Sequence, residues 1–205
     1  MLKDSAKDVV KEPIAVYSNT YTYSDYLKFD FEETVELIRG KLFRMSPAPK
    51  SIHQEISSNI QGVIWSYLKL KPCKVYAAPF DVVLPIKNEK KQTSTTVVQP
   101  DICVICELSK IEESGCVGAP DLIVEILSSS TAKKDLNDKY SIYEEVGVKE
   151  YWIVMPKEQI VEAFHLKNGK YQLRRAYNGE DIITLEMFPD LEINLKEVFG
   201  ITPAV

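Results

Sequence analysis

The hydrophobic pattern of the chain centres on residues 118–151, where two apolar runs flank an amphipathic segment. Residues 121–127 and 151–155 are short apolar runs typical of buried strands, and apolar residues recur at helical spacing over residues 135–146. A strand, a helix and a second strand in this order predict a β-α-β unit with parallel strands and a right-handed crossover. A carboxylate, Glu125, stands inside the first strand, where burial is costly unless another group pairs with it.

One lysine interrupts the division between polar and apolar positions in the predicted helix at residues 135–146. At 100° per residue, Lys139 falls within the apolar sector that also contains Tyr140 and Tyr143. Its ammonium either extends past its neighbours to water or points at Glu125 or at a ligand beside it. The helical pattern by itself leaves both interpretations open.

Two further helices and several strands are predicted from the rest of the chain. A T-x-x-D cap at Thr22 to Asp25 opens a short helix, and an apolar stripe predicts a long helix over about residues 51–70. Alternating runs and turn signals predict strands or hairpins at residues 34–45, 74–85, 97–106, 160–176 and 181–194. Polar or charged composition predicts loops at residues 86–96 and 107–118. A short apolar segment predicts a closing helical turn at residues 195–199.

The order of these elements predicts an α/β or α+β fold with a mixed sheet. The chain has 205 residues, which is enough for one substantial domain and short for two. Residues 1–20 lack apolar periodicity and predict a flexible N-terminal arm. We therefore expect a single domain over residues 21–205.

Two polar residues in these elements are candidates to line a cleft. His53 falls within the apolar sector of the predicted helix at residues 51–70. It is either a core histidine or a group that faces a cleft. A cleft fits this position because the first turn of a helix favours anions. Glu36 lies in the first strand of the predicted hairpin, as an exposed strand residue or as the acidic wall of a site.

Composition limits the cellular setting and the mode of nucleic-acid binding. The net charge of −5 argues against broad adhesion to nucleic acid, although it is compatible with a small site bridged by metal ions. The chain has no apolar run of about 18 residues, so we expect no membrane span. Charges interrupt the N-terminal segment, which therefore does not resemble a secretory signal, and a cytoplasmic location is expected.

Four cysteines raise the question of zinc or redox chemistry, because Cys103 and Cys106 form a C-x-x-C motif. Three-residue spacing within a predicted strand directs the two thiols to opposite faces. No second C-x-x-C and no nearby histidine pair completes a zinc site. We therefore expect all four cysteines, Cys73 and Cys116 included, to be small buried thiols in a reducing compartment.

Asp101 and Glu125 are acidic residues on neighbouring predicted strands, 24 residues apart. Two carboxylates suit a hard divalent cation such as Mg²⁺, which also retains waters and binds phosphate oxygens. A lysine beside such a pair stabilises negative charge at a reacting phosphate. The pair therefore predicts metal-dependent cleavage of a phosphodiester, provided that both carboxylates lie on one face of the sheet.

Pro100-Asp101 followed by the strand residue Glu125 resembles the PD-(D/E)XK nuclease superfamily. More narrowly, the chain resembles the Uma2 family, also called DUF820, from about Tyr21 to Phe199. The matching segments are VELIRGKL, SIHQEI, VVQPDICVI, GAPDLIVEILS, the D-x-x-x-K-x-x-x-Y of Asp135, Lys139 and Tyr143, and GVKEYWIV. Each segment is modest by itself, but their order along the chain is specific.

The resemblance implies a restriction-endonuclease-like core: a helix, a three-stranded antiparallel meander, a crossover helix and a further strand. It also implies a DNA endonuclease that uses Mg²⁺ or Mn²⁺, with DNA as its substrate. The expected metal ligands are Asp101, Glu125 and the main-chain carbonyl of Ile126. Of the remaining site residues, Lys139 is expected to stabilise the transition state, and His53 and Glu36 are expected to line the cleft.

The chain departs from the superfamily pattern at Leu127, where the motif lysine is expected two residues after the acid. Lys139 is the candidate replacement, since migrated lysines occur in this superfamily. The departure leaves an alternative, in which a catalytically decayed module retains the fold and binds nucleic acid or protein. Since nucleases that cut duplexes often pair two sites and cyclic dimers are the commonest oligomers, we also expect a homodimer.

Overall fold

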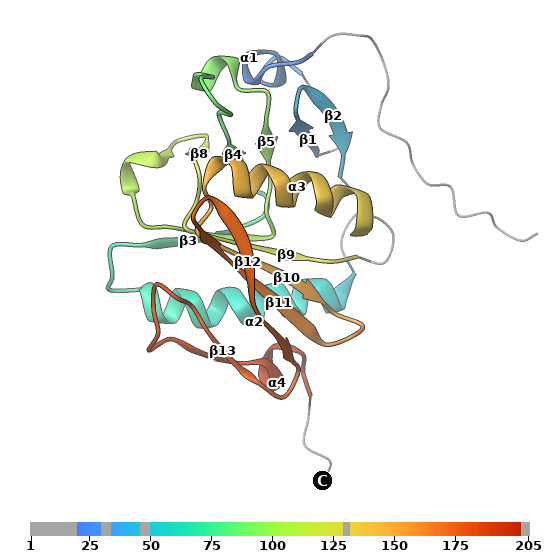
Figure 1. Ribbon diagram of the computed structural model, residues 1–205, viewed down its shortest axis with the longest axis vertical. Coiled ribbons are helices and arrows are strands. Elements are labelled where there is room, and N and C mark those ends of the chain that lie inside the picture. Colours follow the sequence, from blue (N-terminus) through green and yellow to red (C-terminus); the bar gives the residue numbers. More distant parts are fainter. Residues whose placement is uncertain (1–19, 30–33, 46–49, 129–131, 202–205) are drawn as a thin grey trace, which may run out of the picture.

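Apolar runs form the strands of a central sheet, and amphipathic helices cover both of its faces (Figure 1). The structure is a computed structural model. It describes residues 20–29, 34–45, 50–128 and 132–201, without the side chains of residues 132–136. The expected N-terminal arm therefore lies outside the described residues, except for Thr20.

The central sheet has the strand order β12-β11-β10-β9-β6-β3. Its first three strands along the chain pair antiparallel as a meander, and β10 then pairs parallel with β9 after the crossover helix α3 (Ala132–Val146). The expected restriction-endonuclease-like core is therefore present. The strands are β3 (Lys74–Ala77), β6 (Ile102–Ile105), β9 (Leu122–Ile126), β10 (Glu150–Met155), β11 (Ile160–Lys167) and β12 (Lys170–Asn178).

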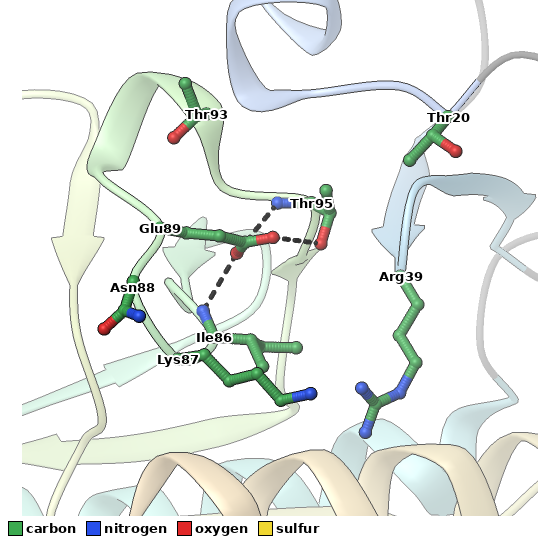
Figure 2. Close-up of a pocket in the computed structure, with 8 residues that line it drawn as sticks. All are labelled: Thr20, Arg39, Ile86, Lys87, Asn88, Glu89, Thr93 and Thr95. Atoms are coloured by element: carbon green, nitrogen blue, oxygen red, sulfur yellow. Dashed lines mark hydrogen bonds between the residues drawn. The ribbon is translucent and has the colours of Figure 1, made fainter.

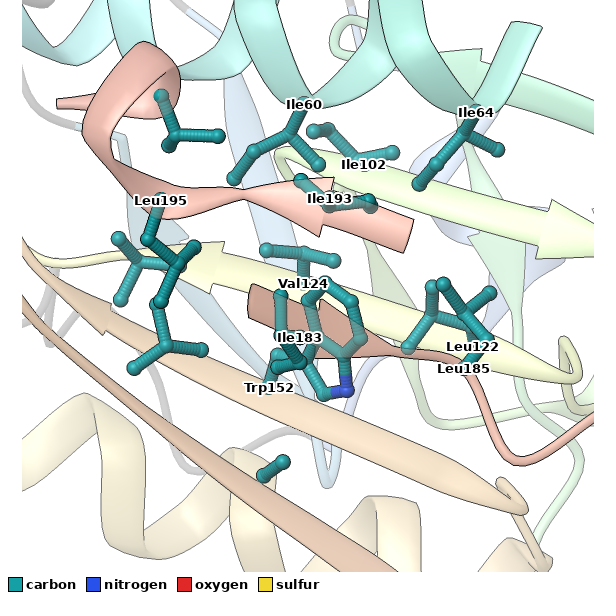
Figure 3. Packing of buried hydrophobic residues seen from close by; sticks show 14 of the residues in the cluster. Ile60, Ile64, Ile102, Leu122, Val124, Trp152, Ile183, Leu185, Ile193 and Leu195 are labelled. Atoms are coloured by element: carbon teal, nitrogen blue, oxygen red, sulfur yellow. The ribbon is translucent and has the colours of Figure 1, made fainter. Parts of the chain in front are cut away.

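Alternate residues of β9 point to the two helix layers, so the face of each residue follows from its parity. Val124 packs in one core with Ile60 and Ile64 of α2 (Ser51–Leu68), as Figure 3 shows. Ile123 belongs to a second core, which contains residues of α3. Because Glu125 has the parity of Ile123, its carboxylate faces α3.

A second sheet, with the strand order β2-β1-β5-β4-β8-β7, lies on the α3 side of the central sheet (Figure 1). The predicted hairpin is present, and its turn places Arg39 and Gly40 at φ 47° and 78°, as a two-residue hairpin turn requires. The strands are β1 (Val35–Ile38), β2 (Lys41–Arg44), β4 (Val82–Val83), β5 (Val97–Val98), β7 (Ile111–Glu112) and β8 (Gly115–Val117).

Two predicted strand segments are divided between the two sheets. Residues 74–85 supply β3 and β4, and residues 97–106 supply β5 and β6, so that each segment leaves one sheet and enters the other. Pro79 and Pro100 fall at the two breaks, where a residue without an N–H cannot continue a ladder. Proline therefore marks a change of sheet here.

The predicted loop at residues 107–118 was wrong, because this segment contains β7, β8 and the 3₁₀ turn η2 (Leu108–Lys110). Gly115 has φ 135°, and a Cβ there would lie 2.2 Å from the carbonyl oxygen of Asp81. Glycine permits this close approach, which places β8 parallel to β4. Charged residues in this segment hid the strands from the hydrophobic pattern.

Apart from a 3₁₀ turn within the predicted loop at residues 86–96, the remaining short elements agree with their predicted positions. In α1 (Tyr23–Tyr26), Asp25 Oδ2 accepts hydrogen bonds from Thr22 N and Thr22 Oγ1, at 3.0 and 2.7 Å. None of the helices within the described ranges is long and apolar enough to cross a membrane. The other short elements are η1 (Lys91–Thr93), β13 (Ile182–Thr184), β14 (Glu192–Asn194) and α4 (Leu195–Val198).

The expectation of four free thiols was wrong, because Cys73 and Cys106 form a disulfide. Lys74 pairs with Ile105 in the β3–β6 ladder, so the residues one step beyond them lie opposite each other. Cys103 and Cys116 are free and buried. Cys103 packs in the core on the α3 side and Cys106 packs against the α2 core, so the two cysteines of the C-x-x-C occupy opposite faces as expected. The argument for a reducing compartment therefore no longer holds.

Candidate active site

The β6–β9 ladder places Asp101 and Glu125 opposite each other. Ile102 pairs with Val124, and one further step of the antiparallel register brings Asp101 beside Glu125. Directly opposed residues lie on the same face of a sheet, with Cβ atoms about 4.5–5.5 Å apart. The two residues therefore lie together at one end of the two strands, where the Glu125 carboxylate faces α3.

Lys139 from α3 reaches this end of the sheet and lies between two carboxylates. Its Nζ is 3.0 Å from Glu125 Oε1 and 2.9 Å from Glu36 Oε1. Lys139, Glu125 and Glu36 are only 7%, 8% and 6% exposed. The lysine therefore points inward rather than out to water, and Glu36 of β1 is a buried wall of the cluster rather than an exposed strand residue.

Burial and neighbouring charges set the protonation of this cluster. Burial raises the pKa of Glu125 to about 7, and the charges of Asp101 and Glu36 add to the rise while Lys139 opposes it. Burial works against the charged form of Lys139, but Glu125 and Glu36 outweigh it and raise the pKa of the lysine. Lys139 therefore remains a cation throughout the physiological range.

Tyr143 completes the contacts of Glu125 and was not among the predicted site residues. Its hydroxyl donates a 2.7 Å hydrogen bond to Glu125 Oε1, the same oxygen that Lys139 approaches. Lys139 and Tyr143 are four residues apart, so they share one face of α3. The D-x-x-x-K-x-x-x-Y spacing contained this signal. No described residue donates a hydrogen bond to the other oxygen, Glu125 Oε2.

His53 approaches the site from the first turn of α2. Its Nε2 lies 3.3 Å from Asp101 Oδ2, and that oxygen also accepts a 2.7 Å hydrogen bond from the main-chain N–H of Ile126. The hydrogen bond with Asp101 raises the pKa of His53, burial opposes this, and the Ile126 carbonyl and Glu125 contribute further to the rise. His53 is therefore a neighbour of the carboxylates rather than an isolated core histidine.

A second layer of polar residues supports Glu36. The main-chain N–H of Gln99 donates a 2.8 Å hydrogen bond to Glu36 Oε1, and the Gln99 side chain donates to Asp81 Oδ1 at 2.7 Å. Tyr26 also donates to Asp81 Oδ1, at 3.3 Å. Nothing in the local pattern marked Gln99 or Asp81 as neighbours of the site, because β1, β4 and β5 meet only in the folded second sheet.

Comparisons with known proteins identify the family of the chain. A family model named Uma2 and described as "Putative restriction endonuclease" matches residues 23–196. The chain belongs to the Uma2 family.

Two proteins of Synechocystis sp., each described as an "Uncharacterized protein", are similar to the chain. The first, slr1290, is 23% identical over 165 residues, which cover 79% of this chain and 83% of the relative. The second, sll1609, is 24% identical over 165 residues, which cover 78% of this chain and 89% of the relative.

A solved structure from Anabaena variabilis, described as a "putative nuclease belonging to DUF820", has the same fold as this Uma2 chain. Its TM-score is 0.69 at 22% sequence identity, over 88% of this chain and 98% of that chain. Because the identity is low, the likeness concerns the fold. It bears out the expected α/β restriction-endonuclease-like architecture.

In this Uma2 chain, Leu127 is a partly buried side chain packed against the α3-side core. No ammonium reaches the carboxylates from that position. Lys139 of α3 instead places its Nζ 3.0 Å from Glu125 Oε1. The ammonium of the cluster therefore comes from the helix that follows the strand, at the position that the helical pattern left open.

The oxygen donor set suits hard divalent cations such as Mg²⁺ and Mn²⁺ more than zinc or copper. Within the part of the chain that the structure describes, no group of three or more His, Cys, Asp or Glu side chains has the arrangement of a metal site. Mg²⁺ needs only one or two carboxylates, because waters and substrate oxygens complete its shell. Asp101, Glu125 and Glu36 bring three negative charges when ionised and Lys139 one positive charge, and this excess favours a bound cation.

Proposed function

We propose that this protein is a DNA endonuclease that uses Mg²⁺ or Mn²⁺ to hydrolyse phosphodiester bonds. The observation that carries the proposal is the position of Lys139 Nζ, 3.0 Å from Glu125 Oε1, on the face of the sheet where Asp101 opposes Glu125. Two carboxylates and a buried ammonium form the donor set that metal-assisted phosphodiester hydrolysis needs. The Uma2 family description and the likeness to a putative nuclease from Anabaena variabilis support the same reaction class.

Asp101 and Glu125 would hold the metal, together with the main-chain carbonyl of Ile126. Each carboxylate already has one oxygen engaged, Asp101 Oδ2 by Ile126 N and Glu125 Oε1 by Tyr143 and Lys139. Their other oxygens accept no hydrogen bond from any described residue and remain for a cation. A divalent cation, when bound, neutralises charge on the scissile phosphate and activates a water molecule for attack.

Lys139 would stabilise the negative charge that develops on the phosphate during attack. Its ammonium is kept protonated by Glu125 and Glu36 and is desolvated, which strengthens its interaction with charge. Glu36 orients the ammonium and is itself fixed by the N–H of Gln99. The lysine therefore needs no rearrangement of solvent when the charge develops.

His53 would position Asp101 rather than hold the metal. Its Nε2 faces the oxygen of Asp101 that Ile126 N also binds, which restrains the carboxylate and leaves Oδ1 for the cation. Partners of this kind orient metal ligands in many sites, and their loss lowers metal affinity by about 10- to 100-fold. His53 and Glu36 thus line the proposed cleft in supporting roles.

The second candidate is a module that binds nucleic acid or protein without cleaving it. The replacement of the motif lysine by Leu127 favours this candidate. A binding module of this kind requires no bound metal and no role for Lys139. The two candidates therefore differ in whether the carboxylates bind a cation and whether DNA is cut.

A metal titration combined with a DNA cleavage assay tests the proposal. The wild-type chain should bind Mg²⁺ or Mn²⁺ in calorimetry and cut DNA in its presence, and Glu125→Ala should lose both properties. Glu192→Ala, which removes an exposed carboxylate on β14, is the matched control and should retain both. Metal binding without cleavage by the wild-type chain would favour the binding module, and the absence of metal binding would end the nuclease proposal.

The proposed endonuclease acts as a homodimer, because cutting both strands of a duplex needs two sites and cyclic dimers are the commonest assemblies. Sedimentation velocity at micromolar concentration measures this directly. A species of twice the chain mass is expected, and a monomer would contradict the homodimer without affecting the assignment of the site.

A further inference from the structure

A hollow of about 510 Å³ lies apart from the carboxylate cluster and contains none of its residues. It opens between the β1–β2 turn and the loop that precedes β5 (Figure 2). Its lining is polar except for one isoleucine and consists of Thr20, Arg39, Ile86, Lys87, Asn88, Glu89, Thr93 and Thr95.

Two cationic side chains point into this hollow from opposite walls. Figure 2 shows the Arg39 guanidinium and the Lys87 ammonium extending towards the same space. Arg39 Nη2 is 2.7 Å from Glu145 Oε2, which leaves further N–H donors of its guanidinium available. Lys87 is exposed and forms no salt bridge with any residue in the described ranges. The hollow therefore offers two positive groups to an anion.

The acidic residue of the lining, Glu89, is engaged by its own loop. Glu89 Oε2 accepts hydrogen bonds from the N–H groups of Ile86 and Thr95, at 2.9 and 3.2 Å. Its Oε1 accepts a 2.7 Å hydrogen bond from Thr95 Oγ1. The carboxylate thus holds the loop closed and is turned towards these donors (Figure 2).

The backbone holds the two cations in fixed places. Arg39 and Lys87 both have positive φ, 47° and 58°, which few residues other than glycine adopt. The N–H of Gly40 donates a 2.7 Å hydrogen bond to the carbonyl of Thr95, which ties the hairpin turn to the loop. The backbone positions from which both side chains extend are therefore set by the fold before any ligand binds.

The β1–β2 hairpin carries both Glu36 of the cluster and Arg39 of the hollow, and Arg39 also contacts α3, the helix that carries Lys139. Arg39 follows Glu36 by three residues, or roughly 10 Å along a strand, and its partner Glu145 follows Lys139 by six residues, or roughly 9 Å along a helix. At about 3.4 Å of rise per nucleotide, this separation corresponds to about three nucleotides of a strand. A chain of phosphates bound at the carboxylates therefore has a second cationic group within its reach.

We propose that this hollow binds a phosphate group through Arg39 and Lys87. Arginine forms paired hydrogen bonds with phosphate, and lysine binds it as a point charge. The phosphate belongs to a nucleic-acid strand that spans the carboxylate site, a source that rests on the proposed function, or to a free phosphate or nucleotide. The chemistry that is recognised is the same in both cases.

The first arm of the test measures the salt dependence of nucleic-acid binding. Affinity for a duplex oligonucleotide is followed by fluorescence anisotropy across a salt series, in the Glu125→Gln background, so that no cleavage occurs. Adding Lys87→Gln should lower the slope of log affinity against log salt by about 0.9, the value of one phosphate contact. Lys74→Gln is the matched control, since Lys74 is exposed on β3 at the end of the ladder remote from Asp101, and it should leave the slope unchanged.

The second arm uses inorganic phosphate as the probe and does not depend on nuclease function. Phosphate should shift the backbone amide resonances of Gly40 and Thr95 in the wild-type chain, and Lys87→Gln should remove this shift while Lys74→Gln retains it. An altered salt slope assigns the hollow to nucleic acid, and a phosphate shift with an unaltered slope assigns it to a free phosphate or nucleotide. If Lys87→Gln matches Lys74→Gln in both arms, the phosphate site is overturned, even when Glu125-dependent cleavage is observed.

Discussion

Lys139 and Tyr143 lie one turn apart on α3 and engage the same oxygen of Glu125. The ammonium is 3.0 Å and the hydroxyl 2.7 Å from Oε1. Two donors on one oxygen fix the carboxylate and leave Oε2 for a cation. The helix α3 therefore orients Glu125, the proposed metal ligand, and also supplies the Lys139 ammonium of the site.

Replacing Tyr143 with phenylalanine should weaken both metal binding and the fold. The change removes a hydrogen bond to a buried carboxylate, which is worth about 1.5–3 kcal/mol. We expect Mg²⁺ affinity in calorimetry to fall about 10-fold or more, within the range for partners of metal ligands. Tyr140→Phe is the matched control on the same aromatic cluster and should leave the affinity unchanged. Equal metal affinity in the two variants would assign Tyr143 a packing role only.

Replacing Lys139 with methionine should separate metal binding from cleavage. The variant loses a cation that competes with the metal for Glu125, so it should bind Mg²⁺ as well as the wild-type chain or better. Cleavage of DNA should fall by about 10²–10³, the value of an electrostatic contact made in the transition state. Undiminished cleavage, in an assay where Glu125→Ala is inactive, would remove Lys139 from the mechanism.

Glu150 should make the fold less stable as the pH rises towards neutrality. Burial raises its pKa to about 7, and hydrogen bonding by Trp152 and the charge of Arg174 only partly oppose this. The usual pKa of this carboxyl is 4.5, and a higher pKa in the folded state means that its protonated form stabilises the fold at low pH. This stability is lost progressively as the pH rises from about 4.5 to about 7, and the change amounts to as much as about 3 kcal/mol.

Urea denaturation between pH 5 and 8.5 measures this dependence. Glu150→Gln should flatten the profile relative to the wild-type chain, and the exposed-site control Glu192→Gln should not. Glu125 titrates in the same window, and burial lowers the pKa of His165. Both residues are unchanged in the variants, so the difference between the wild-type and Glu150→Gln profiles isolates Glu150. Parallel profiles for the wild-type chain and Glu150→Gln would contradict the prediction.

The Cys73–Cys106 bond should leave two reactive thiols in the unfolded, unreduced protein, against four after reduction. Thiol titration in denaturant counts them. The bond joins residues 33 apart, so its reduction should lower the free energy of unfolding by about 3–4 kcal/mol in the chain-entropy account. A count of four before reduction would show that the bond does not form.

Local periodicity determined much of this protein. Spacing of two along β9 decided that Glu125 shares a face with Ile123, and spacing of 3.6 along α3 decided that Lys139 lies on its inner side. These patterns suffice because they depend only on neighbours in the chain. The cap of Thr22 and Asp25 and the turn at Arg39 are local in the same way.

Only the tertiary structure decided which distant residues meet. Glu36 reaches Lys139 because the second sheet packs against α3, and Cys73 meets Cys106 because β3 and β6 pair in one register. Pro79 and Pro100 lie where a strand leaves one sheet, but the local pattern does not specify that the strand beyond each of them enters another sheet. Periodicity specifies the face that a residue occupies. The partner on that face is set by the packing of whole elements, because many alternative pairings of these elements are compatible with the same pattern.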